Sequence, residues 1–403
     1  MALATGIAAP AIPVFSKSFD VSFEVASLVF TANLLGGAVS TLPTGYLVDR
    51  IGRRKIILAG PLLLAISSVL TWNAHSFAEL LVYRFIGGWA QNMWTLGRLA
   101  MIADTGATRS RGRQITGMLT METTGRLMGP AVGGFIAAAF DVRMPFLIHA
   151  ALCLLAIVPS FKLIRESAPD RRLDASPGER PAEGRGALAA LMTLPMIMFL
   201  CAQLFASFTR GTLFSGAMHL YPVYAYGVGS GTIGMIASMA SVIGIPITLT
   251  SGHVMDRFGR KATIVPGFSL LCLAFIFMAF TAQVHTAFEI WVLSFLLVQA
   301  SQSITSGNMQ TLGSDMAPRH ARGKFMGMWQ LIGHIGTTLS PAVFGVVSAA
   351  YGFAAAFAVF ALTALGSAVI VATQVRETVR REDAHPAQES TAEPAEPTAK
   401  VGA

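Results

Sequence analysis

The chain has 403 residues, of which 53% are hydrophobic and only 12% are charged. A soluble globular protein carries about a quarter charged residues, so this chain cannot hide its apolar surface in one water-facing fold. The net charge of +8 would suit nucleic acid as a partner, but the basic residues lie in short loops between apolar runs. We therefore expect a polytopic α-helical membrane protein whose partners are the lipid bilayer and a small-molecule substrate, with no nucleic acid.

Apolar stretches follow one another along the chain. All but the first are long enough to cross a bilayer, which takes about 20 helical residues at 1.5 Å each. The first stretch ends before Ser16 and Lys17, and we interpret the start of the sequence as lying inside a truncated helix 1. The predicted helices cover residues 1–15, 22–47, 55–74, 78–103, 113–140, 144–164, 190–220, 230–254, 262–282, 286–314, 323–350 and 353–375.

Two segments are polar and rich in proline and charge, which is typical of flexible connections and disordered tails. They divide the chain into an N-terminal six-helix bundle (1–165), a linker (166–189), a C-terminal six-helix bundle (190–376) and a tail (377–403).

The loop arginines and lysines predict the orientation. Nearly all of them fall on the side that carries the linker and the tail, while Lys17 and Arg143 fall on the other. The excess of basic residues marks the cytoplasmic side of membrane proteins. We expect a multi-pass protein of the plasma (inner) membrane, with the linker and the C-terminus in the cytoplasm.

The sequence repeats itself. GYLVDRIGRRK (45–55) returns as GHVMDRFGRK (252–261), 207 residues later. Gly129 and Pro130 return as Ser340 and Pro341, 211 residues later, and the spacing from Asp104 to Gly112 returns from Asp315 to Gly323. Each pair falls on the same side of the membrane, which predicts a parallel repeat of six helices plus six, with a substrate site between the halves near the midplane.

These motifs resemble the major facilitator superfamily over nearly the whole chain. The loop after helix 2 matches that family's most specific motif, and YRFIGG around Arg84 resembles its helix-4 arginine motif. GRLMGPAVGG (125–134) matches the helix-5 pattern of family antiporters, and GIAAPAIP (6–13) resembles a signature of twelve-helix drug:proton antiporters. The resemblance implies the all-α fold of that superfamily, two parallel-repeat six-helix bundles, and a monomer.

The two loop motifs place charges where helices meet at the membrane surface. Asp49 can accept hydrogen bonds from the first amides of helix 3 and from nearby arginines, and Gly45 permits two helices to approach closely. We interpret the cluster as a latch that breaks during transport, with plain cytoplasmic anchoring as the alternative. The candidate gate residues are Gly45, Asp49, Arg50, Gly52, Arg53, Asp104, Arg111, Gly252, Asp256, Arg257, Gly259, Arg260, Asp315 and Arg322.

Helix 5 carries a stripe of glycines at Gly125, Gly129, Gly133 and Gly134. Pro130 removes a backbone hydrogen bond there and bends the helix. We expect a facing helix to rock against this stripe, with static tight packing as the alternative.

Charges inside predicted spans cost several kcal/mol unless they are paired or hydrated, so each is a candidate site residue. Glu122 falls near the midplane and shares a helix face with Arg126, four residues on. Arg98 on helix 4 competes for Glu122, and the role of Arg84 is structural by the resemblance. We interpret Glu122 as the proton-coupling carboxylate, against the alternative of a permanent structural pair.

Arg210 has no acidic neighbour in the sequence, and we expect it either to bind an anionic group of the substrate or to snorkel. His334 is a reserve proton carrier or a packing residue. The excess of embedded arginines favours an anionic or zwitterionic organic substrate. Further candidates for the lining of the cavity are Gln91, Asn92, Trp94, Gln203, Phe208, Trp329 and Gln330.

The leading hypothesis is a proton-coupled antiporter that exports small organic molecules by alternating access. The alternatives are an uptake symporter for an organic anion and a non-transporting membrane sensor or scaffold. We do not expect an enzyme, because the sequence has no nucleophile–base set, metal cluster or phosphate-binding loop. Cys153, Cys201 and Cys272 form no metal or disulfide pattern, so no metal and no cofactor are expected, with a proton gradient as the driving force.

Overall fold

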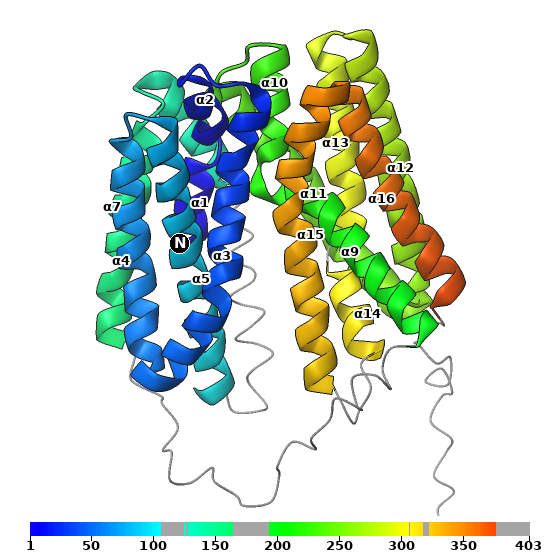
Figure 1. Cartoon of the computed structure of the whole chain (residues 1–403), viewed down its shortest axis with the longest axis horizontal. Coiled ribbons are helices and arrows are strands. Elements are labelled where there is room, and N and C mark those ends of the chain that lie inside the picture. The colour runs from blue at the N-terminus through cyan, green and yellow to red at the C-terminus, as the bar shows by residue number, and fades with distance from the viewer. Residues whose placement is uncertain (106–124, 126–127, 164–192, 306, 317–321, 376–403) are drawn as a thin grey trace, which may run out of the picture.

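A computed structural model shows two groups of helices standing side by side (Figure 1). The structure describes residues 1–105, 125, 128–163, 193–305, 307–316 and 322–375, and every element in these ranges is a helix. The predicted linker and tail lie outside the described residues, so the bounds given above for the two halves stay a prediction.

The N-terminal bundle is drawn in blue to teal in Figure 1. Its members are α1 (Ala2–Ala8), α2 (Ala11–Lys17), α3 (Phe23–Ile51), α4 (Arg53–Trp72), α5 (Phe77–Thr105), the helical segment Met128–Ala139 and α7 (Met144–Leu163).

The C-terminal bundle is drawn in green to orange in Figure 1. Its members are α9 (Leu194–Ser215), η1 (Ala217–His219), α10 (Leu220–Ala225), α11 (Ser230–Phe258), α12 (Lys261–Val284), α13 (Phe288–Thr305), α14 (Asn308–Met316), α15 (Arg322–Tyr351) and α16 (Phe353–Gln374). Across both bundles, nine helices of the described ranges are long and apolar enough to cross a membrane.

Three predicted helices are interrupted, and the prediction of continuous helices there is wrong. The segment 1–15 breaks around Pro10, which has no amide hydrogen to continue a helix. The segment 190–220 ends at Ser215, because Gly216 adopts φ +85°. The segment 286–314 divides into α13 and α14 next to Gly307, at φ +80°. Both glycine values lie in the left-handed region that other residues rarely adopt.

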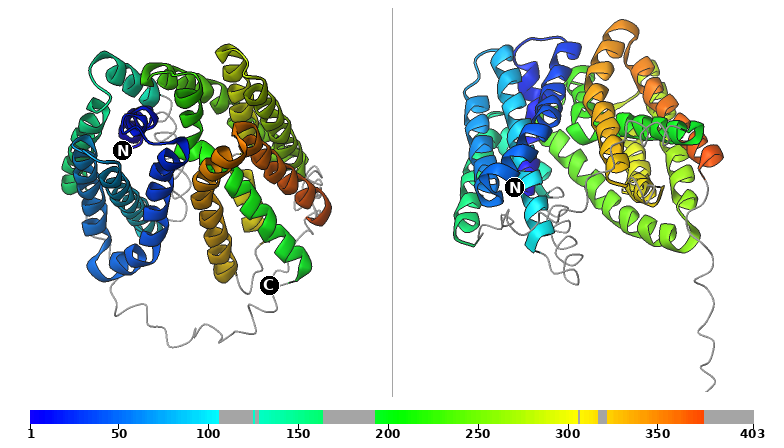
Figure 2. Two further views of the ribbon diagram at one scale, coloured as in Figure 1. Left: turned by 45° about the horizontal axis from the view of Figure 1, so that its top comes forward. Right: turned by 60° about the horizontal axis from the view of Figure 1, so that its bottom comes forward.

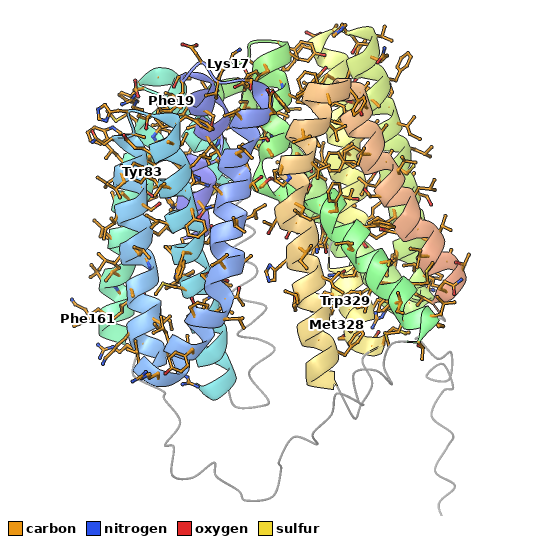
Figure 3. The ribbon with its side chains drawn as sticks, viewed as in Figure 1. Lys17, Phe19, Tyr83, Phe161, Met328 and Trp329 are labelled. Carbon is orange, nitrogen blue, oxygen red and sulfur yellow. The ribbon has the colours of Figure 1, made fainter. Side chains whose placement is uncertain are left out.

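The links from α3 to α4 and from α11 to α12 lie at one end of the molecule, at the bottom of Figure 1. We call it the basic end because Arg50, Arg53, Arg54, Arg257, Arg260 and Lys261 all lie there. The opposite end, which carries the turns at Asn73 and His285, is called the far end. Figure 3 labels Phe161 near the basic end and Lys17 at the far end.

Matched hydrogen bonds confirm that the bundles repeat one another. Arg54 at the start of α4 donates from Nη2 to the carbonyl oxygen of Phe161 in α7, at 2.8 Å. Lys261 at the start of α12 donates from Nζ to the carbonyl oxygen of Ala372 in α16, at 2.7 Å. Lys261 follows Arg54 by 207 residues and Ala372 follows Phe161 by 211, the offsets found in the sequence. The repeat is therefore parallel, because both bonds lie at the basic end.

Candidate functional site: the interface between the two bundles

Helices α3 and α15, one from each bundle, cross near the far end. A Cβ atom added to Gly345 would lie 3.0 Å from the Cα of Glu24 and would collide with the hydroxyl of Ser27. A larger residue at this position would therefore push the two helices apart. The ring of Phe23 extends the contact, edge-on to the ring of Phe344 at 5.3 Å between centroids.

A second crossing joins the segment Met128–Ala139 to α11. A Cβ atom added to Gly134 would lie 2.9 Å from the Cα of Gly234. Gly345 follows Gly134 by 211 residues, and Gly234 follows Ser27 by 207. The two crossings that join the bundles are therefore copies of each other within the internal repeat.

Polar contacts fasten the bundles at the far end. Lys17 donates from Nζ to the carbonyl oxygen of Val223 at 2.8 Å, and Tyr224 donates from its hydroxyl to the carbonyl oxygen of Val21 at 2.8 Å. Burial and, to a smaller extent, the Glu24 carboxylate raise the pKa of Tyr224 to about 12. The hydroxyl therefore keeps its proton at neutral pH and remains a donor.

Toward the basic end the bundles separate. Among the described residues, no hydrogen bond or ring contact joins the bundles there, and the ribbons of α3 and α15 diverge in this direction (Figures 1 and 2). Leu42 on α3 is 85% exposed and Leu331 on α15 is 60% exposed. The structure is thus closed at the far end and parted toward the basic end.

The loop motifs lie at the basic end. Gly52 and Gly259 each turn one helix into the next, at φ values of 105° and 101°. Arg260 pairs from Nε with Oδ2 of Asp315 at 3.0 Å, and both side chains are partly buried. This pair lies within the C-terminal bundle, between the start of α12 and α14, so it ties two helices of one half together.

The remaining described members of the motifs make local contacts. Arg53 donates to the carbonyl oxygen of Val48 at 3.3 Å. Arg50 donates to the Tyr46 hydroxyl at 2.7 Å, and Arg257 lies over the ring of the next residue, Phe258.

One expectation at the gate motif is corrected. A Cβ atom at Gly45 or Gly252 would meet no atom of the described residues within 4 Å, so no described helix approaches Gly45 as closely as predicted. That part of α3 lies where the bundles have parted. Lying outside the described residues are the side chains of Asp49, Asp104, Asp256 and Arg322 and the whole of Arg111.

The glycine stripe of helix 5 does two different things. Gly125, Gly129 and Gly133 face the short N-terminal helix α1, so closely that added Cβ atoms would meet its backbone. Only Gly134 faces the other bundle, while the carbonyl oxygen of Pro130 closes against Gly234. The first three glycines therefore support packing within one half, and Gly134 belongs to the interface.

The predicted coupling pair falls outside the described residues, which include neither Glu122 nor Arg126, so this pair stays a prediction. The guanidinium of Arg98 stacks on the ring of Trp94 at 5.7 Å in α5. Arg84 lies 14 residues before Arg98, on nearly the same face of α5. The backbone carbonyl oxygen of Arg84 accepts a hydrogen bond from Asn33 at 3.0 Å, which ties α5 to α3, and the role expected of the arginine side chain stays a prediction.

Two further candidates lie in the C-terminal bundle. His334 is exposed on α15, on the side where the bundles part. Arg210 lines a narrow pocket together with Gln302, and its guanidinium lies 5.7 Å from the centre of the Phe214 ring.

Several residues suggested for the cavity lining instead pack inside the bundles. Trp329 is fully buried and stacks on Phe199 at 4.6 Å between centroids, and Figure 3 labels it within the C-terminal bundle. Asn92 donates to the hydroxyl of Ser40 at 2.8 Å, which holds α5 against α3. Phe208 packs on an aromatic ring of α16, and Gln203 is buried against α15. Gln91 and Gln330 are exposed.

Sequence reasoning missed the residues that close the far end. Lys17 was counted only as a loop cation, and Tyr224 and Gly345 were not singled out. It also missed a buried pair within the N-terminal bundle, where Ser68 and Nδ1 of His149 share a hydrogen bond at 2.8 Å. No local pattern could have found these residues, because the partner of each lies on a helix distant in the sequence.

Comparison with known proteins agrees with this geometry. The family model described as Major Facilitator Superfamily matches residues 1–228 and 199–401. Among curated relatives, the multidrug resistance protein MdtG of Enterobacter lignolyticus is 27% identical over 382 residues, covering 92% of this chain and 88% of that protein. The quinolone resistance protein NorA of Staphylococcus aureus is 30% identical over 164 residues, covering 41% and 42% of the two chains.

Solved structures show the same fold. A D-xylose–proton symporter superposes with a TM-score of 0.75 at 18% identity and covers 94% of this chain and 97% of its own. The inward-open xylose transporter XylE of Escherichia coli gives a TM-score of 0.75, at 18% identity and with 94% and 95% coverage.

Two parallel-repeat helical bundles around a parted interface define a membrane transporter. The chain belongs to the Major Facilitator Superfamily. It is a multi-pass membrane protein that acts on small-molecule substrates, and the expected fold class is confirmed.

Proposed function

We propose that this transporter exports small organic molecules in exchange for protons. The observation that carries the proposal is the closed far end with bundles parted toward the basic end, which is one of the two states that alternating access requires. Two relatives are named for multidrug and quinolone resistance, which supports export of organic molecules.

The basic end faces the cytoplasm in this proposal. The arginines and lysines of the links between α3 and α4 and between α11 and α12 gather there, as expected for cytoplasmic loops. The described conformation then takes up substrate from the cell interior, and the rocking of the bundles about their two glycine crossings would release it outside.

Glu122 and Arg126 would couple the proton to the substrate. A carboxylate that pairs with an arginine within the bilayer is stable when ionised, and protonation releases the arginine. In this scheme a proton from outside frees Arg126 for the transport cycle, and loss of that proton to the cytoplasm restores the pair.

The test uses inside-out membrane vesicles with an imposed pH gradient, acid inside, and a fluorescent quinolone such as norfloxacin as the probe. Antiport predicts that norfloxacin accumulates in the vesicles and that its addition releases protons from the lumen. Uptake that is insensitive to the collapse of the gradient would contradict proton coupling.

Glu122→Gln should exchange norfloxacin across the membrane without any dependence on the pH gradient. Glu289→Gln is the matched control, because Glu289 is an exposed carboxylate in the first turn of α13. A Glu122→Gln variant that keeps the proton dependence of the native protein would rule out the coupling role.

A second candidate is proton-coupled uptake of an organic anion, which the embedded arginine Arg210 favours. The same vesicles separate the two candidates. Symport moves the probe and the proton in the same direction, so adding the probe outside inside-out vesicles would acidify the lumen instead of releasing its protons.

A further inference from the structure

The narrow pocket in the C-terminal bundle is lined by Ala206, Arg210, Phe268, Gln302, Thr305 and Met309. It lies between α9, α12, α13 and α14. Arg210 lies within the candidate membrane span Leu194–Ser215, and Gln302 lies within the candidate span Phe288–Met316. The pocket therefore sits within the membrane-spanning part of the C-terminal bundle.

Within the part of the chain that the structure describes, no carboxylate pairs with Arg210 and no hydrogen-bond acceptor is bonded to its guanidinium. The guanidinium lies 5.7 Å from the centre of the Phe214 ring, a cation–π contact. A guanidinium presents five N–H donors. In a membrane span such a group faces the interior and marks a substrate or ion site.

A second polar group in the pocket also lacks a partner. Gln302 is 7% exposed, and its Oε1 atom is buried without a hydrogen-bond partner. On the adjoining face of α9, Gln203 and Ser207 each carry a buried side-chain oxygen in the same condition. Buried amides and hydroxyls are normally hydrogen-bonded. This part of the bundle therefore contains polar side chains whose hydrogen bonds the described residues do not complete.

The internal repeat does not demand an arginine here. In the C-terminal bundle, Gly211 packs against Thr337 and Ser340. In the N-terminal bundle, Gly6 packs against Gly129, which is the repeat counterpart of Ser340, 211 residues earlier. The residue before Gly6 is Thr5, and the residue before Gly211 is Arg210. The architecture thus accommodates a small neutral side chain at the equivalent place, which separates the arginine from the needs of folding.

We infer that Arg210 and Gln302 bind the carboxylate of a transported organic acid or zwitterion. The guanidinium pairs with the carboxylate oxygens through two parallel N–H donors. A half-turn of the Gln302 amide brings its NH₂ group to the position of the unpartnered Oε1 atom, where it donates a further bond to the carboxylate. Phe268 and Met309 supply the apolar part of the lining beside these two polar groups. Since this names the chemical class of the substrate, it rests on the proposed transport function.

The test compares norfloxacin, which carries a carboxylate, with its methyl ester, which does not. Binding to the purified full-length protein in detergent is measured by equilibrium dialysis at pH 8. The native protein should bind the acid at least about tenfold more tightly than the ester. In Arg210→Gln, the affinities for the acid and the ester should differ by no more than about twofold. In Gln302→Met, the affinity for the acid should fall by about threefold, while the affinity for the ester should stay unchanged.

Two variants guard against a general loss of structure. Arg210→Lys keeps the charge without the planar fork, and it should retain a reduced preference for the acid. Lys162→Gln removes an exposed cation at the end of α7 and should leave both affinities unchanged. Equal affinity of the native protein for acid and ester, or an unchanged preference in Arg210→Gln, would overturn the inference.

Flux in proteoliposomes separates this inference from the proposed function. If the protein binds the acid in preference to the ester but transports neither, the carboxylate site at Arg210 is supported and the proposed transport function is contradicted. Proton-driven flux of acid and ester at equal rates, unchanged by Arg210→Gln, would keep the function and remove the assignment.

Discussion

The ammonium group of Lys17 lies 5.3 Å from the centre of the Tyr224 ring, which belongs to the other bundle. The same ammonium group donates to the carbonyl oxygen of Val223, and the Tyr224 hydroxyl donates back to Val21. Two hydrogen bonds and a cation–π contact thus cross the interface within two neighbouring residues of α10. These contacts must break whenever the far end opens.

Removing these contacts should favour the open far end. Tyr224→Phe deletes one hydrogen bond and Lys17→Met deletes the other together with the cation–π contact. Each loss should shift the balance of conformations by about 1 kcal/mol, or about fivefold. Spin labels at the exposed far-end positions Asp20 and His285 report the shift as a larger share of long distances. Identical distance distributions in the variants and the native protein would show that these contacts do not stabilise the closed far end.

Bulk at the two glycine crossings should also open the far end. Gly134→Val and Gly345→Val insert side chains where even a Cβ atom meets the facing helix. Overpacking of this kind costs about 1–3 kcal/mol, so we expect norfloxacin flux to fall by roughly 5- to 150-fold. Because the crossings are repeat-related, the two variants should have similar effects.

The matched control for the crossings is Gly327→Val on α15. A Cβ atom at Gly327 would meet no atom of the described part of the chain within 4 Å, and the residue is exposed. Like Gly345→Val, this variant replaces a glycine within α15, but the new side chain does not collide with a facing helix. Its norfloxacin flux should therefore stay close to that of the native protein. A Gly327→Val variant as impaired as Gly345→Val would show that glycine itself matters and that the crossing does not.

The ion pair between Arg260 and Asp315 should contribute modestly to stability. Their side chains are 16% and 32% exposed, so solvent screens part of the attraction. A double-mutant cycle with Arg260→Gln and Asp315→Asn, followed by thermal unfolding in detergent, should give a coupling of about 0.5–1 kcal/mol that shrinks at high salt. A coupling of zero would mean that the pair adds nothing beyond the separate contacts of its members.

His219 should make the protein sensitive to acid. Burial lowers the pKa of His219 to about 4, although a backbone hydrogen bond at Gly216 opposes the shift. In the unfolded chain the pKa is about 6.5. Above pH 6.5 both states are neutral and the residue has no effect. Between pH 6.5 and 4 only the unfolded chain takes up the proton, so stability falls as the pH drops, by up to about 1.4 kcal/mol per pH unit.

His219→Phe should remove this sensitivity while it keeps the ring contact with Phe295, now 5.3 Å between centroids. The measurement is the Tm of the purified protein between pH 7.5 and 5. The exposed His75 serves as the control, and His75→Gln should follow the native curve. If the Tm of His219→Phe falls with decreasing pH as steeply as that of the native protein, groups other than His219 cause the acid sensitivity.

Most of the fold could be predicted from the sequence, because bilayer-spanning helices need long apolar runs and short polar links mark their ends. The breaks at Gly216 and Gly307 could not. The sequence continues in an apolar, helix-compatible manner past Gly216, and the chain has 39 glycines. Many of them, such as Gly345, lie inside helices, so composition alone does not reveal which glycine adopts a positive φ.

The site was less predictable than the fold. The loop motifs drew attention to Arg260 and Asp315, but they did not indicate that these two side chains pair with each other. Trp329 looked like a cavity residue because aromatic side chains often line substrate paths, and it packs on Phe199 instead. Burial and partner choice depend on how helices rotate about their axes, which helical spacing does not specify when nearly every face is apolar.

The matching of the two glycine crossings also bears on the origin of the chain. A single six-helix unit with a glycine on its fifth helix and a small residue on its second would carry both halves of the contact. Two such units placed face to face would satisfy both contacts at once, as in a two-fold symmetric homodimer. Fusion of the units would then have preserved an assembly that already held together, and freed each half to acquire features, such as Arg210, that the other lacks.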